Sequence, residues 1–313
     1  ATLSSMVSNL LADAYENCFG ASVRAQDRPK LIAGLFDHES ETPFHTRALR
    51  NIARIARYGL DCGAEGMLVT DWGDFGHVND PRMAVPGMIF GAQYAWNPAG
   101  DTAENDLLER ISRVEYGDCS ARFVALLRNA SAQAVFTWRE LVEYLELDDG
   151  TGNCNTDVAQ TIPCLADRLV DHLSDCGNAM TVREARNRMM RNMATTIERI
   201  PQANRALQQC MVDIAPIAAH MGNPGITAAV RIAMEGQLLL NRVGFALAEA
   251  HDVRDAHDAG DWRPSDYRAL ARELECWCEA YAKEWNATSQ PSELHRIQET
   301  VWKAADELRR ISK

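Results

Sequence analysis

The chain lacks several features that identify common classes of protein. Its 313 residues contain no apolar run long enough to span a bilayer, and the first residues show no basic-then-apolar signal pattern. Lys and Arg total 32 against 44 for Asp and Glu, which gives a formal net charge of −12. Because phosphate binding needs clustered basic side chains, we expect no nucleic acid as a partner, and the lack of a spanning run predicts no membrane partner.

The spacing of the cysteines does not match that of a metal site. None of the nine cysteines has a spacing that is standard for a zinc or redox site, and the closest pair, Cys276 and Cys278, encloses a single tryptophan. Scattered cysteines in odd number are typical of free thiols in a reducing compartment, so we expect a cytoplasmic protein without a metal or cofactor. We interpret the stretch rich in His and Asp that begins at His251 as a solvated loop.

The pattern of apolar residues changes near Trp96-Asn-Pro-Ala-Gly100. Before this point strand-like and helix-like segments alternate, an order from which parallel sheets and barrels are built. The sequence therefore predicts an α/β region over residues 1–100. Its expected elements are a helix over 2–17, a short strand over 30–37, a helix over 49–60, a strand over 66–71 and a helix over 86–96.

Residues 101–313 predict a helical domain, whose length is ordinary for a domain. Thr181 and Glu184 form a capping box that opens a helix, which we expect to end at Pro201. The long helices offer a surface for a homo-oligomer. Apolar spacing predicts the other helices around 107–114, 123–127, 134–146, 207–217, 225–250, 265–286 and 292–311, with Leu294, Ile297, Val301, Ala305 and Leu308 on one face of the last.

The most informative segment is Leu68-Val-Thr-Asp-Trp-Gly-Asp-Phe-Gly-His77. The apolar run 66–69 predicts a short buried strand, and two carboxylates, an indole and an imidazole follow it. Polar groups after the C-terminal end of a buried strand are typical of the active-site rim of a βα-barrel. An aromatic face packs well on the apolar side of a pyranose, while carboxylates accept its hydroxyl protons. The segment therefore predicts a sugar-binding site.

Thr70–Asn79, followed by Val85–Asn97, resembles glycoside hydrolase family 20, the β-N-acetylhexosaminidases and their relatives. The last barrel strand of this family typically carries Trp-Gly-Glu or Trp-Gly-Asp, and a helix rich in small residues and ending in Trp follows. Flanking segments around 50–53, 63–66 and 111–118 look similar too, so the resemblance covers about residues 43–130. It implies that residues 1–100 are the last strands and helices of a (β/α)8 barrel, followed by a C-terminal helical bundle.

The resemblance also implies roles for individual residues and a substrate, a glycan ending in N-acetylhexosamine. Trp72 would form a wall of the pocket for the non-reducing-end sugar, and Asp74, in place of the commoner Glu, would bind the distal hydroxyls. Asp71 either faces the site or bonds the backbone of the glycine turn. His77 is a further candidate contact, although a histidine in such a loop more often bonds local backbone groups. A structural alternative makes Trp72 a cover for the barrel end and Asp74 a cap for the next helix.

The catalytic machinery of the family is not recognisable in this chain. In the family the substrate's acetamido oxygen attacks the anomeric carbon, a Glu protonates the leaving oxygen, and the preceding Asp orients the acetamido group. None of the 70 residues before Asp71 resembles that pair, and a complete barrel needs about 250 residues. We therefore expect a sugar-binding portion of a glycosidase that contains no catalytic residue and is inactive alone. The alternative is a non-catalytic helical interaction or carbohydrate-binding module with a degenerate sugar site.

Overall fold

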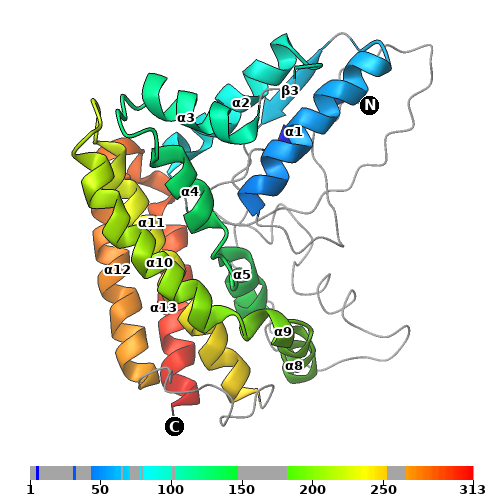
Figure 1. Cartoon of the computed structure of the whole chain (residues 1–313). Helices are drawn as coiled ribbons and strands as arrows, with labels where there is room; N and C mark the ends of the chain where they lie inside the picture. Colours follow the sequence, from blue (N-terminus) through cyan, green and yellow to red (C-terminus); the bar gives the residue numbers. More distant parts are fainter. Residues whose placement is uncertain are drawn as a thin grey trace. The chain divides into compact units, whose positions relative to one another are not determined.

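The computed structural model describes residues 5–6, 31–32, 44–64, 66–70, 78, 80–100, 103–146, 182–251 and 266–312. Most of these residues are helical (Figure 1). The chain forms two compact units. Unit 1 comprises Ala1–Gln133 and Ala206–Met234, and unit 2 comprises Ala134–Arg205 and Glu235–Lys313. The domain boundary expected near residue 100 stays a prediction.

Unit 1 contains three short parallel strands. The central strand β3 (Met67–Thr70) lies between β1 (Ser5–Met6) and β2 (Leu31–Ile32). Helices α1 (Phe44–Asp61) and α2 (Val85–Trp96) both contact β3 and each other (Figure 1). The strand expected over 66–71 and the helices expected over 49–60 and 86–96 are thereby confirmed. The expectation that this strand is buried is wrong, because Leu68 is 52% exposed and Met67 and Val69 are only partly buried.

The predicted barrel portion is wrong. The described residues form no strands besides these three, and β1 and β2 have only two residues each, with Ser5 opposite Val69 and Leu31 opposite Met67. A barrel closes eight parallel strands, whereas the other described elements are helices. Alternating strands and helices suit many architectures, and only the family resemblance extended that pattern to a barrel. The helix expected over 2–17 is wrong at Ser5 and Met6; the rest of that range lies outside the described residues.

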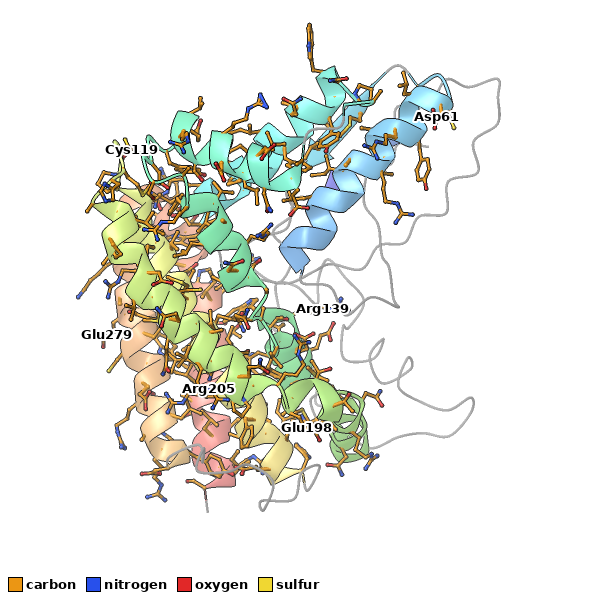
Figure 2. All side chains as sticks on the ribbon, in the orientation of Figure 1. Asp61, Cys119, Arg139, Glu198, Arg205 and Glu279 are labelled. Atoms are coloured by element: carbon orange, nitrogen blue, oxygen red, sulfur yellow. The ribbon has the colours of Figure 1, made fainter. Side chains whose placement is uncertain are left out.

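The apolar spacing within 49–60 predicts one buried face of α1, formed by Leu49, Ile52, Ala53, Ala56 and Leu60, and most of this face is buried. Leu49, Ile52 and Ala56 are at most 6% exposed, whereas Leu60, expected on the same face, is 55% exposed. Leu60 lies in the last turn of α1, close to Asp61 at the end of the helix (Figure 2). The prediction therefore fails at Leu60, and Ala53 is only partly buried.

Helices α3 (Glu104–Val114) and α4 (Phe123–Ser131) complete the first part of unit 1, as predicted. The loop after α3 is held by two backbone bonds to residues 220–222. Cys119 N–H donates to His220 at 3.0 Å, and Gly222 N–H donates to Gly117 at 3.1 Å. Gly117 has a φ of +60°, and a Cβ there would lie 3.0 Å from the Gly222 nitrogen, so this position requires glycine.

Unit 2 is built from helices in its described part. The hairpin of α12 (Tyr267–Thr288) and α13 (Leu294–Ile311) packs closely, and the five apolar residues expected on one face of α13 are all buried. Glu279 is exposed on the outer side of α12 (Figure 2). The elements are α5 (Trp138–Glu146), α8 (Val182–Asn192), α9 (Ala194–Ile197), α12 (Tyr267–Thr288), η3 (Pro291–Glu293) and α13 (Leu294–Ile311), with parts of α10 (Ile200–Ala218) and α11 (Ile226–Ala250).

Pro201 begins a helix instead of ending one. It is the second residue of α10, and the single long helix expected before it is divided into α8 and α9. Proline is well tolerated in the first turn because the amide proton that it lacks would have no partner within the helix there. Thr181, the first residue of the expected capping box, lies outside the described residues.

The structure also tests the expectations about membrane-spanning segments and free cysteines. Within the described ranges, no helix combines the length and apolarity that crossing a membrane requires. The described cysteines that the structure gives as free are Cys62, Cys119, Cys210, Cys276 and Cys278. For these five positions the prediction of free thiols is confirmed.

Candidate functional site

The four residues predicted to bind sugar, Asp71, Trp72, Asp74 and His77, lie outside the described residues. Their position in the chain is nevertheless informative, because β3 ends at Thr70 and the segment starts at the next residue. Ligands of parallel sheets bind outside the carboxyl ends of the strands. The segment thus follows the end of β3 at which such sites occur.

The chain returns from this segment through a capped turn, η2 (Pro81–Ala84). The Asp80 carboxylate accepts a bond from the backbone N–H of Arg82 at 2.9 Å. It also binds the Arg82 guanidinium, with an Nη2–Oδ2 distance of 2.6 Å. The Asp80 side chain is only 9% exposed, whereas the Arg82 side chain is 37% exposed, so the ion pair faces water on its arginine side. Asp80 therefore fixes the start of the turn that leads into α2.

Helix α2 approaches β3 through glycine. The small residues Gly87, Gly91 and Ala92 predict a close contact for this helix, but only Gly87 and Gly91 are buried, whereas Ala92 is exposed. A Cβ at Gly91 would lie 2.4 Å from Cγ2 of Val69, so the two elements touch backbone to side chain. On the opposite side, Trp96 at the end of α2 is 91% exposed. Helix α2, which follows the predicted sugar segment, is therefore packed tightly against β3, the strand that precedes the segment.

Gly91→Ala is expected to destabilise unit 1 by about 1–3 kcal/mol, because the added methyl overlaps a β-branched side chain that cannot turn away. The measurement is the free energy of unfolding in denaturant. Val69→Ala in the same chain should restore part of the loss, since it removes the atom that clashes. A double variant no more stable than Gly91→Ala would contradict the contact.

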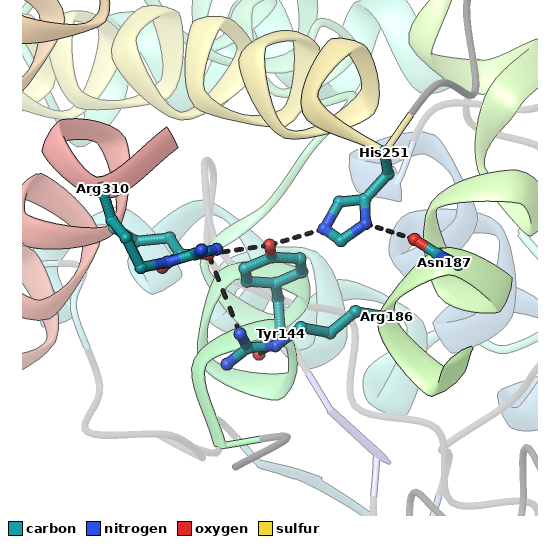
Figure 3. Close-up of polar contacts among 6 residues, drawn as sticks. Tyr144, Arg186, Asn187, His251 and Arg310 are labelled. Carbon is teal, nitrogen blue, oxygen red and sulfur yellow. Dashed lines mark hydrogen bonds and ion pairs between the residues drawn. The ribbon is translucent and has the colours of Figure 1, made fainter. Parts of the chain in front are cut away.

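A second group of polar side chains lies in unit 2, where four helices meet (Figure 3). We call it the Tyr144 cluster. The Tyr144 hydroxyl lies 2.7 Å from Nε2 of His251 and 3.0 Å from Oε1 of Glu307. Nδ1 of His251 in turn contacts Oδ1 of Asn187. Arg310 also belongs to the cluster, since its Nε and Nη2 each lie 2.7 Å from a Glu307 oxygen.

Arg186 adds a second cation to the Tyr144 cluster. Its guanidinium carbon lies 4.6 Å from the centre of the Tyr144 ring, within the range of a cation–π interaction. Its Nε donates to the Tyr144 backbone carbonyl at 3.1 Å, and its Nη1 lies 3.8 Å from Oε1 of Glu307. The cluster therefore ties α8 to both α5 and α13.

Burial and neighbouring charges shift the pKa values of Tyr144 and Glu307 in opposite directions. Burial, reinforced by the negative charge of Glu307, raises the pKa of the Tyr144 hydroxyl above its usual value. Burial would also raise the pKa of Glu307, but hydrogen bonds from Arg310 and the charges of both arginines outweigh it and lower that pKa. At neutral pH Tyr144 is therefore protonated and Glu307 ionised.

Sequence reasoning missed the Tyr144 cluster. Tyr144 is 107 residues from His251 and 163 residues from Glu307, so no spacing pattern links them. The interpretation of His251 as part of a solvated loop is wrong for that residue, because it is partly buried at the end of α11; the loop after it lies outside the described residues. Within the described part, no three His, Cys, Asp or Glu side chains are grouped as a metal site requires.

Comparison of the chain with models of protein families, with curated proteins and with solved structures gives no significant match. The functional interpretation therefore rests on the residues of this chain and on the frame that the structure gives them.

Proposed function

We propose that this chain binds glycans ending in N-acetylhexosamine, as a portion of a glycosidase similar to family 20 whose catalytic Asp-Glu pair lies outside this chain. The main support is the segment Asp71-Trp-Gly-Asp74, which begins at the residue after β3. The strand on one side and the glycine-packed helix α2 on the other agree with the pattern on which the family resemblance was based.

In this proposal Trp72 and Asp74 bind different parts of the sugar. The indole covers the apolar face of the sugar ring, and the Asp74 carboxylate accepts protons from the distal hydroxyls. A sugar without those hydroxyls would leave the carboxylate unpaired, which gives discrimination among sugars. Asp71 and His77 are additional contacts in the same segment. The chain binds sugar but does not by itself hydrolyse a glycosidic bond.

Calorimetric titration of the full chain with methyl N-acetyl-β-glucosaminide tests this function. We expect saturable binding that weakens about tenfold or more in Trp72→Ala and Asp74→Ala, because a hydrogen bond to a charged group contributes about 1.5–3 kcal/mol. Trp96→Ala and Asp106→Ala are matched controls, since both residues are exposed on helices. Unchanged affinity in both segment variants, or no binding by the wild type, would contradict the proposal.

The mostly helical character of the described residues favours a second candidate, a non-catalytic helical interaction module. The two candidates differ in what accompanies the chain in its natural source. A polypeptide that contains the family's Asp-Glu pair, continuous with or copurifying with this chain, would support the glycosidase. A chain isolated alone that binds no sugar would support the helical module. A cytoplasmic location belongs to the proposal as well and rests on the cysteine pattern.

A further inference from the structure

The Tyr144 cluster contains a hydroxyl with one proton and two neighbours that could accept it. The proton can go to Glu307 or to Nε2 of His251, at 3.0 and 2.7 Å. An ionised carboxylate is the stronger acceptor, so the hydroxyl donates to Glu307. The Tyr144 oxygen can then only accept from the imidazole. This contact therefore requires a proton on Nε2 of His251.

The other ring nitrogen of His251 faces an acceptor too. Nδ1 contacts Oδ1 of Asn187, and an amide oxygen has no proton to donate. Nδ1 must therefore also be protonated. An imidazole with protons on both nitrogens is a cation, so the imidazolium satisfies the contacts of the cluster together with ionised Glu307.

The charged side chains of the Tyr144 cluster come from two helices other than α11. Glu307 and Arg310 lie on α13, Arg186 lies on α8, and Tyr144 on α5 adds no charge while it holds its proton. The arginines contact Glu307 and Tyr144, whereas Nε2 and Nδ1 of the imidazole contact the oxygen atoms of Tyr144 and Asn187. The Tyr144 hydroxyl links Glu307 to the imidazole, and the negative charge of Glu307 offsets positive charge of the arginines. The direct contacts of the ring thus favour its protonated form.

We propose that His251 is a pH-sensitive clasp that, when protonated, holds the C-terminal end of α11 to α5, α8 and α13. The proton affinity of His251 is then higher in the folded chain than in the unfolded one. Stabilisation by the clasp is full below the unfolded pKa of about 6.5 and is lost as pH rises through the folded pKa. The proposal concerns unit 2 alone and is independent of sugar binding.

Long-range ¹H–¹⁵N NMR of the histidine rings, recorded from pH 5 to 9, tests the clasp. We expect His251 to titrate about one unit above 6.5, a tenfold rise in proton affinity, with both nitrogens protonated at neutral pH. Tyr144→Phe keeps the buried ring but removes the acceptor, so it should lower the pKa of His251 by about one unit. His295→Gln, on the exposed start of α13, is the matched control and should change nothing at His251. Titration at or below 6.5, or the same pKa in Tyr144→Phe, would overturn the proposal.

Hydrogen exchange gives a second, independent readout. The His251 amide donates to the Leu247 carbonyl at 3.1 Å and so reports on the last turn of α11. Its protection factor should fall between pH 6 and pH 8 in the wild type. In His251→Gln, which keeps a polar side chain without the charge change, the same protection factor should not vary with pH. Equal pH dependence in the two proteins would contradict a clasp at His251.

Discussion

Asp118→Ala is expected to destabilise unit 1 by roughly 3–5 kcal/mol. Asp118 is fully buried, and its carboxylate accepts bonds from the backbone N–H groups of Ser120, Arg122 and Phe123 at 2.7–2.8 Å. It also accepts from the Ser120 hydroxyl at 2.6 Å. These bonds fix the loop after α3 and provide a partner for the amide of Phe123, the first residue of α4, which would otherwise be buried without one. Alanine removes all of them at once.

The ionisation of Asp118 makes this stabilisation depend on pH. Burial would raise the pKa of Asp118, but the bonds from Ser120, Phe123 and Arg122 outweigh it and hold the pKa below its usual value. A carboxyl group with a lowered pKa stabilises the fold above its unfolded value of about 3.9, and this contribution is lost as pH falls through the folded pKa.

Denaturant unfolding followed by circular dichroism at pH 7 and pH 3 measures both effects. The difference between wild type and Asp118→Ala should be large at pH 7 and smaller at pH 3. Asp106→Ala is the control, because Asp106 is an exposed aspartate in the first turn of α3. If Asp118→Ala were no less stable than Asp106→Ala at pH 7, the capping role would be wrong.

Asn241→Leu is expected to destabilise unit 2 by a similar amount, roughly 3–5 kcal/mol. Asn241 is fully buried in α11, and its Oδ1 accepts from the backbone N–H groups of Val135 and Phe136, each at 3.1 Å. The same oxygen accepts from Gln237 at 2.9 Å, and Nδ2 donates to Asn204 at 2.8 Å. Leucine is close in size, so the main loss is of hydrogen bonds rather than of packing.

The comparison of Asn241→Leu with Asn286→Leu isolates this loss. Asn286 is exposed on α12, so the same substitution there should change the free energy of unfolding by less than about 0.5 kcal/mol. Hydrogen exchange at the Val135 and Phe136 amides should accelerate in Asn241→Leu alone. Equal stability of the two variants would show that Asn241 does not hold the chain before α5.

The helices could be predicted from sequence wherever one apolar stripe decides their packing. The predicted inner residues of α13 are all buried because a spacing of three and four residues places them on one side of a helix. Strand β3 was also predictable, since a short apolar run ends at polar residues. These features depend only on residues close together in the chain.

Features that depend on distant residues could not be predicted in this way. A proline can follow the end of one helix or lie in the first turn of the next, and its own residue type does not distinguish the two. Pro201 was therefore predicted to end a helix, although it lies in the first turn of α10. The barrel was wrong because a motif of one strand does not determine how many strands surround it. The Tyr144 cluster brings together four helices through one or two polar residues from each, which form no periodic pattern in the sequence. For the sugar segment, the residue types predict the chemistry of binding, and the strand β3 and the helix α2 that flank the segment were both predictable from the sequence.

Fluorine NMR of the chain labelled with 5-fluorotryptophan tests sugar binding at Trp72 most directly. The chain has seven tryptophans, and Trp72→Phe assigns the resonance that belongs to Trp72. On titration with methyl N-acetyl-β-glucosaminide, we predict a saturable shift of the Trp72 resonance and none for exposed Trp96. A Trp72 resonance that stays fixed up to saturating sugar, or a shift confined to other tryptophans, would contradict a sugar site at this segment.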